Sequence, residues 1–205
     1  MTKKKTQVLR LKITLEHIDP APWREIEIRS DKFLPHLHDA IQAAFLWYDM
    51  HLWDFQISDR KYQMKSEDFW IEPMFGPPVM EVTTKKLDFF QSAKVPPVSY
   101  VYDFGDYWQH RVDLVSTREV VPNEPLPRFV GGQWATPPED IGGPPMYEAF
   151  KEARKDVNHL EHEWAKEAGY VDWAHDEIHA DVVSEQFATL QRQKTRRTSR
   201  WVMEG

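Results

Sequence analysis

The chain of 205 residues is long enough for one globular domain, or for one domain with a helical extension. Hydrophobic residues make up 41% of it and charged residues 29%, which excludes the low-hydrophobicity profile of a disordered chain. The net charge of −7 argues against a surface that binds polyanions over its whole extent, and the absence of cysteine excludes disulfides, thiolate nucleophiles and Cys-ligated zinc.

Positive charge gathers at the two ends of the chain. The basic residues concerned are Lys3, Lys4, Lys5, Lys194, Arg196, Arg197 and Arg200. Residues 191–205 are interpreted as a basic tail, either a solvated terminus or an arm that binds nucleic acid. No apolar run reaches the roughly 20 residues that a membrane-spanning helix needs, so the sequence predicts a cytoplasmic protein with no membrane partner.

The first half of the chain predicts a hairpin followed by a helix. Residues 6–17 and 23–29 alternate between apolar and polar side chains around a proline-rich break, as two paired strands do. Apolar residues at spacings of three and four then predict an amphipathic helix from about Leu34 to Tyr48. His36 and His38 are expected on the surface or rim of this helix and not as a metal pair. Residues 51–57 predict a further strand, which a turn at 58–61 returns along the sheet.

Prolines and glycines dominate the predictions for the rest of the chain. Residues 66–98 are expected to be loop with short pieces of structure, and residues 115–145 to lack regular structure. Helices are predicted at 146–168 and at about 181–193. The sequence thus predicts a single α+β domain over residues 1–190, with a largely antiparallel sheet, one amphipathic helix packed on it, and a helical C-terminal part at 146–190.

Residues 100–112 hold the densest set of potentially chemical side chains and read as two aromatic-rich strands joined by a tight turn. A two-residue Gly105-Asp106 turn pairs Asp103 with Trp108 and Val101 with His110. Asp103 and His110 would then be diagonal neighbours about 7–8 Å apart at the backbone. An odd-length loop or a bulge would shift this register and separate them.

The functional interpretation of this hairpin is a polar cluster of Asp103, Asp106 and His110. Carboxylates with one imidazole can hold a divalent metal ion or form a general acid–base pair. The candidate binding residues around this cluster are Tyr102, Trp108, Glu139 and Asp140. The structural interpretation is a half-buried His110 that Asp103 orients, with Asp106 shaping the turn.

A weaker metal hypothesis concerns His175 and His179, which stand four residues apart and would share a face if their segment is helical. The candidate metal ligands are therefore Asp103, His110, His175 and His179. A third ligand for the histidine pair is not identifiable from the sequence, and polar helix faces of this kind are usually solvated.

Four blocks of the sequence resemble a known family. Residues 37–45 (LHDAIQAAF) and 51–55 (HLWDF) are similar to the block "LH-x-x-IQ-x-x-x-x-W-x-x-x-H-L-x-x-F" of the Ri-plasmid open-reading-frame-three family. Residues 102–110 (YDFGDYWQH) and 137–147 (PPEDIGGPPMY) complete the match, and the resemblance covers about residues 6–190. Members are often labelled as passenger proteins of insertion elements or as TnpR-like resolvases, a label that implies little chemistry.

The chain departs from the family near its Pro-Pro-Glu-Asp block. Relatives commonly carry cysteines there, where this chain has Ala135 or Thr136 and Ile141, so a role for those cysteines in metal binding does not carry over. The resolvase label also fits poorly, because a serine recombinase needs an activated serine in an arginine-rich site. Ser99 has no such setting.

Three functions stay open from the sequence. The leading hypothesis is a non-catalytic binding or interaction module from a plasmid or mobile element, since no catalytic constellation is complete and aromatic residues that anchor interfaces are abundant. The rival is a metal-dependent hydrolase or nuclease that uses Asp103, Asp106 and His110. The third is nucleic-acid binding through the basic tail. The sequence does not decide whether the chain is an enzyme, or which ligand it takes.

Overall fold

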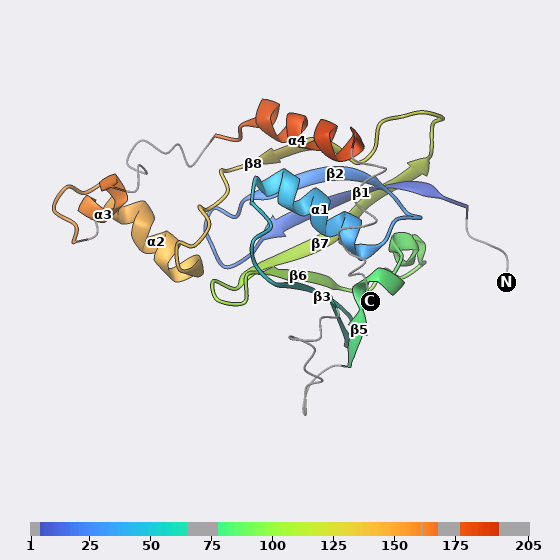
Figure 1. Ribbon diagram of the computed structural model, residues 1–205, viewed down its shortest axis with the longest axis horizontal. Helices are drawn as coiled ribbons and strands as arrows, with labels where there is room; N and C mark the ends of the chain where they lie inside the picture. Colours follow the sequence, from blue (N-terminus) through green and yellow to red (C-terminus); the bar gives the residue numbers. More distant parts are fainter. Residues whose placement is uncertain (1–4, 65–77, 161, 168–176, 193–205) are drawn as a thin grey trace.

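The computed structural model describes residues 5–64, 78–160, 162–167 and 177–192, which build an eight-stranded sheet with helices (Figure 1). The strands lie in the spatial order β5-β4-β3-β6-β7-β1-β2-β8. Their bounds are β1 Gln7–Leu15, β2 Trp23–Arg29, β3 Trp53–Ile57, β4 Arg60–Gln63, β5 Val79–Glu81, β6 Val98–Tyr102, β7 Trp108–Glu119 and β8 Arg128–Gln133. The helices are α1 Leu34–Phe45, α2 Gly143–Ala153, α3 His162–Glu167 and α4 Ala180–Arg192, with short 3-10 turns η1 Val82–Thr84 and η2 Leu87–Gln91.

The sheet is antiparallel except where β5 runs parallel to β4. Helix α1 lies across one face of the sheet, and α4 packs beside α1 and over β8 (Figure 1). Leu9, Leu11 and Ile13 of β1 point to this face and are completely buried, together with Leu37 and Ile41 of α1. Each fully buried aliphatic side chain contributes roughly 1.5–3 kcal/mol, so this layer is the main source of stability.

The predicted N-terminal hairpin and the α+β fold class are confirmed. Strands β1 and β2 pair with Leu11 opposite Ile26. The alternation places the apolar side chains of both strands on the face of the sheet that α1 covers. The predicted first helix ends three residues earlier than expected. Leu46 adopts a left-handed conformation with φ of 59°, which terminates α1 at Phe45 and leaves Tyr48 78% exposed in the following loop.

Two sequence predictions for the second half are wrong. Within residues 115–145, β7 continues to Glu119 and residues 128–133 form β8, which pairs with β2 at the end of the described sheet. An edge strand tolerates Gly131 and Gly132, because one side of its backbone has no partner among the described strands and a bulge relaxes the pairing at Glu25. The single helix expected at 146–168 is two helices, α2 and α3, separated by turns. The last predicted helix is confirmed as α4.

Helices α2 and α3 lie beyond one end of the sheet (Figure 1). Lys151 of α2 donates to the carbonyl oxygen of Asp19 at 2.5 Å, which fastens the helix to the β1–β2 loop. No helix in the described ranges is both long and apolar enough to cross a bilayer. The division into a domain at 1–190 and a tail at 191–205 stays a prediction, because residues 193–205 lie outside the described residues.

Candidate functional site

The β6–β7 connection does not have the predicted register. Tyr102 pairs with Trp108 and Tyr100 with His110, so residues 103–107 form a five-residue loop and the predicted two-residue turn is wrong. Asp103 has φ of 58°, and its side chain accepts a hydrogen bond from the backbone N–H of Gly105 at 2.8 Å. An aspartate that bonds the backbone two residues ahead favours a loop over continued strand pairing.

This register places His110 in the core and away from Asp103. Its ring is fully buried, with edge-to-face contacts to Phe45 and Trp47 at centroid distances of 5.0 and 5.3 Å. Burial lowers the pKa of His110 to about 3, so the imidazole is neutral at physiological pH. The predicted Asp103–His110 pair is therefore wrong, and His110 is a core residue.

Asp103 meets other side chains instead. His51 Nε2 lies 3.0 Å from Asp140 Oδ1 and 3.7 Å from Asp103 Oδ2. One ligand atom from each of the three side chains lies within 4.8 Å of the other two. His51 comes from the loop between α1 and β3, Asp103 from the β6–β7 loop and Asp140 from the β8–α2 connection. We call this group the His51 cluster.

Hydrogen bonds hold the three loops of the His51 cluster together. Tyr102 donates to Glu139 Oε1 at 2.5 Å and accepts from the backbone N–H of Met50 at 3.0 Å. Glu139 Oε2 accepts from the backbone N–H of Tyr48 at 3.2 Å. Burial and, after it, the bond to Glu139 raise the pKa of Tyr102, which keeps its hydroxyl protonated as the donor.

Asp106 fastens the β6–β7 loop to the start of α2 and does not enter the His51 cluster. Its Oδ2 accepts from the backbone N–H of Gly142 at 3.0 Å. Gly142 and Gly143 both have positive φ, of 91° and 76°, which glycine adopts without steric cost. The backbone of Gly143 thus passes directly against the carbonyl group of Asp106.

The sequence identified Asp103 and Asp140 as candidates but missed His51. His51 could have been found from the pairing of residues 53–57 with the strand that ends at Tyr102, in which Trp53 lies opposite Tyr102. That register brings the residues just before β3 beside those just after β6. His51 and Asp103 are therefore neighbours although 52 positions separate them.

A second group of possible ligands, His38, Asp39 and Asp49, is better described as a buried hydrogen-bond network. His38 is fully buried, so its expected place at the helix rim is wrong; its ring stacks on Trp53 at 3.9 Å. His38 Nδ1 lies 2.7 Å from the Tyr100 hydroxyl and Nε2 lies 2.8 Å from Asp49 Oδ1. Because both ring nitrogens are bonded within the protein, neither is left for a metal ion.

Replacing Tyr100 with phenylalanine is expected to lower the free energy of unfolding by about 1–3 kcal/mol. The change removes the hydroxyl shared by His38 Nδ1 and Gln42 Nε2, and both groups stay buried. Urea denaturation measures the difference, with Tyr62→Phe as the control at a buried tyrosine whose hydroxyl is outside this network. Equal losses in the two variants would show that the network contributes nothing.

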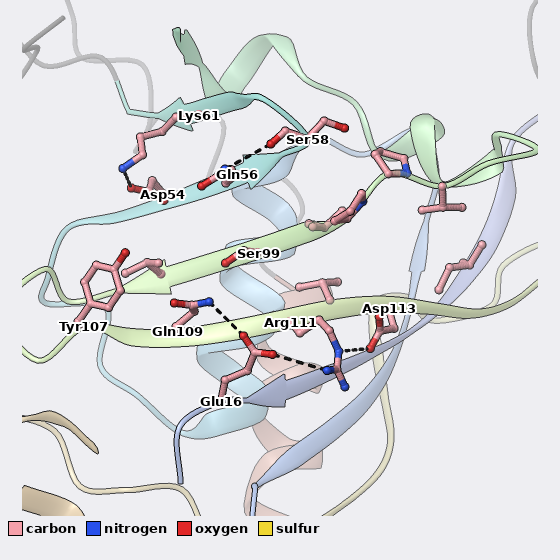
Figure 2. Close-up of a pocket in the computed structure, with 17 residues that line it drawn as sticks. Glu16, Asp54, Gln56, Ser58, Lys61, Ser99, Tyr107, Gln109, Arg111 and Asp113 are labelled. Carbon is pink, nitrogen blue, oxygen red and sulfur yellow. Dashed lines mark hydrogen bonds and ion pairs between the residues drawn. The ribbon is translucent and has the colours of Figure 1, made fainter. Parts of the chain in front are cut away.

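A concavity of about 690 Å³ lies on the other face of the sheet, over β3, β6 and β7 (Figure 2). Figure 2 shows its charged side chains already joined to one another. Lys61 Nζ lies 2.8 Å from Asp54 Oδ2, and Arg111 Nε lies 2.8 Å from Asp113 Oδ2. The His51 cluster does not line this concavity, so its size alone does not make it the chemical site.

The remaining candidate residues lie apart from the cluster. Trp108, a candidate binding residue from the sequence, is fully buried in the core. His179 is exposed just before α4 begins, outside a helix. His175 and the basic residues Lys194, Arg196, Arg197 and Arg200 lie outside the described residues.

The fold and the cluster define an α+β protein with one large antiparallel sheet and a histidine–aspartate group where three loops meet. The chain belongs to the family of plasmid pRiA4b ORF-3-like proteins, whose model matches residues 7–185. It is 32% identical to a Sinorhizobium fredii protein described as "Uncharacterized protein y4hQ", over 80% of this chain and 83% of that one.

A solved structure has the same fold. The crystal structure of MM3350, a protein of unknown function from Methanosarcina mazei Go1, matches with a TM-score of 0.75 and 27% sequence identity. The match covers 87% of this chain and 98% of that one. The family resemblance expected from the four sequence blocks is thus confirmed.

Proposed function

We propose that this chain is a binding module that holds a divalent metal ion between His51, Asp103 and Asp140. The observation that carries the proposal is the setting of His51 Nε2. This atom is shielded from solvent, faces two carboxylates and, within the part of the chain that the structure describes, makes no hydrogen bond. Two carboxylates and an imidazole suit a borderline cation such as Mn²⁺ or Zn²⁺, whose charge would offset that of the aspartates.

Exposed apolar side chains on the same loops support an interaction role. Tyr48 and Met50, which precede His51, are 78% and 76% exposed, and Phe104 and Tyr107, which lie in the same loop as Asp103, are 41% and 55% exposed. Apolar and aromatic side chains that gather around a polar centre are typical of surfaces that bind partners. The proposed partner-binding surface is therefore the loop end of the sheet, in a protein that we expect to be cytoplasmic.

A second candidate function is metal-dependent hydrolysis. The His51 cluster supplies three protein ligands, and catalytic metal sites characteristically leave a further position for water. This candidate differs from the sequence hypothesis, because His51 and Asp140 take the places given to His110 and Asp106. If the bound ion were only structural, no hydrolytic activity would depend on both the ion and Asp103.

The metal proposal is tested by isothermal titration of the chelator-treated chain with Mn²⁺ and with Zn²⁺. We expect one ion per chain, and at least a tenfold loss of affinity in His51→Ala and in Asp103→Asn. His179→Ala is the control, because it removes an exposed histidine outside the cluster. Absence of saturable binding, or an equal loss in the control, would contradict the proposal.

Nucleic-acid binding through the basic tail stays a prediction. If it holds, removal of residues 191–205 lowers a salt-sensitive affinity for DNA or RNA, because the tail carries clustered positive charge. A filter-binding or fluorescence titration of the full and truncated chains at two salt concentrations measures this. Unchanged affinity after truncation would remove the tail from consideration.

A further inference from the structure

Arg24 is a buried cation that has no charged partner among the described residues. Its side chain is 2% exposed, and its guanidinium donates to the carbonyl oxygens of Ala44, Trp23 and Gln133 at 2.8–3.0 Å and to Thr136 Oγ1 at 3.2 Å. All four acceptors are neutral, and no carboxylate in the described part of the chain forms an ion pair with it. Burying a charge on neutral partners alone is costly.

The surroundings show how strongly this charge is desolvated. Burial lowers the pKa of Arg24 to about 10. By contrast, Arg118 of β7 lies 2.5 Å from Glu27 Oε2 and 2.7 Å from Glu124 Oε2, and these bonds raise its pKa. The same side-chain type is thus fully neutralised elsewhere in this sheet, and at position 24 it is not.

Arg24 lies at a cavity of about 240 Å³ between α1, the chain after β8 and the start of α4. Phe45, Trp47 and Ile178 supply apolar walls. The neighbouring strand leaves room for the arginine only because residue 132 is glycine: a Cβ there would lie 2.8 Å from Arg24 Cδ and 2.6 Å from the Trp23 carbonyl oxygen. Arg24 therefore supplies the cation, and the missing side chain of Gly132 leaves the space for it.

The acidic residues that line the cavity do not neutralise Arg24. Glu139 binds the hydroxyl of Tyr102 and the backbone N–H of Tyr48, and Glu177 is exposed. A guanidinium has five N–H donors in a planar fork, and the four hydrogen bonds use four of them. One donor on Nη2 is left for a ligand, and one oxygen of an anion can accept this charge-assisted hydrogen bond.

We propose that the Arg24 cavity binds a small organic anion, with its carboxylate on the guanidinium and its apolar part against Trp47 and Ile178. A carboxylate would supply the countercharge that the described residues do not provide, and the apolar walls favour a ligand with a hydrocarbon group over a bare inorganic ion. The inference goes beyond the proposed function, because none of the three residues of the His51 cluster lines this cavity.

The experiment titrates the full chain, in the presence of chelator, with benzoate, with the neutral analogue benzamide and with inorganic phosphate. We expect saturable binding of benzoate, at least tenfold tighter than that of benzamide or phosphate. Arg24→Lys is expected to weaken benzoate binding at least tenfold, since lysine has no planar guanidinium whose other hydrogen bonds hold a donor at the position of Nη2. Arg111→Gln, which removes an already paired surface arginine, is the control and is expected to bind benzoate like the wild type.

A second measurement keeps the test decisive if the lysine variant does not fold. In the wild-type chain the Nε–H resonance of Arg24 is expected to shift with the same saturation curve as the benzoate titration. Benzoate binding no tighter than that of benzamide or phosphate, a resonance that does not move, or a folded Arg24→Lys variant with unchanged affinity would each overturn the proposal. The chelator makes every outcome independent of the metal ion.

Discussion

Gly143→Ala is expected to lower the free energy of unfolding by about 3 kcal/mol or more. A Cβ at this position would lie against the backbone carbonyl group of Asp106, closer than 3.0 Å. The φ of 76° adds roughly 1–2 kcal/mol for any residue with a Cβ. Because the contact is to backbone and not to the end of a flexible side chain, local rotation cannot relieve it.

The matched control is Gly131→Ala in β8, where an added Cβ meets no atom within 4 Å and φ is not positive. We expect this change to alter stability by less than about 1 kcal/mol. Urea denaturation followed by tryptophan fluorescence measures both variants against the wild type. If the two alanine variants were equally stable, the close approach between α2 and the β6–β7 loop would not exist in solution.

The same variant also probes the candidate site. Gly143 lies next to Gly142, which holds Asp106, and three residues after Asp140 of the His51 cluster. A shift of this connection would move Asp140 relative to His51, so a folded Gly143→Ala chain is expected to bind a divalent ion more weakly. Metal titration of Gly143→Ala and Gly131→Ala side by side separates this effect from a general loss of stability.

Acidification from pH 7 to pH 5 is expected to lower the free energy of unfolding by about 2 kcal/mol. Burial lowers the pKa of His110 to about 3, whereas an unfolded chain has a histidine pKa of about 6.5. Between about pH 3 and pH 6.5 this histidine is therefore protonated in the unfolded state and neutral in the folded state. The stabilisation is therefore complete above pH 6.5 and is lost at about 1.4 kcal/mol per pH unit as the pH falls toward 3.

The control for this pH dependence is His110→Gln, which does not titrate. Its absolute stability is expected to be lower, but its loss between pH 7 and pH 5 is expected to be much smaller. His36, whose pKa burial also lowers, leaves a residual slope. Burial raises the pKa of Glu27, but its partners Arg118 and Arg128 lower it by more, so the net shift is downward. The stabilisation from Glu27 is therefore lost only as the pH falls below its unfolded pKa of about 4.3. Parallel stability curves for the wild type and His110→Gln between pH 7 and pH 5 would refute the assignment.

Glu139 connects the Arg24 cavity with the His51 cluster. Glu139 lines the Arg24 cavity and accepts from Tyr102, which adjoins Asp103 of the His51 cluster. A coupling between the two proposed sites would therefore act through this carboxylate. Titrating benzoate with and without Mn²⁺ measures that coupling as a change in affinity.

The sequence by itself determined the elements whose apolar side chains follow a regular period. Strands β1 and β2 and helices α1 and α4 were predictable because each buries one face on a single core, and burial imposes a spacing of two or of three to four residues. The class of fold follows from these elements, and so does the family resemblance, whose blocks include the most strongly patterned segments.

Only the tertiary structure decided where the chemistry lies. The register of β6 on β7 depends on a five-residue loop with left-handed Asp103 and Tyr107, and a shift of one position carries His110 from the site into the core. The His51 cluster joins three loops that are distant in sequence, which no periodicity encodes. That no carboxylate of the described ranges pairs with Arg24 is likewise invisible in sequence, because it depends on which side chains reach a buried position once β2, α1 and the chain after β8 have packed together.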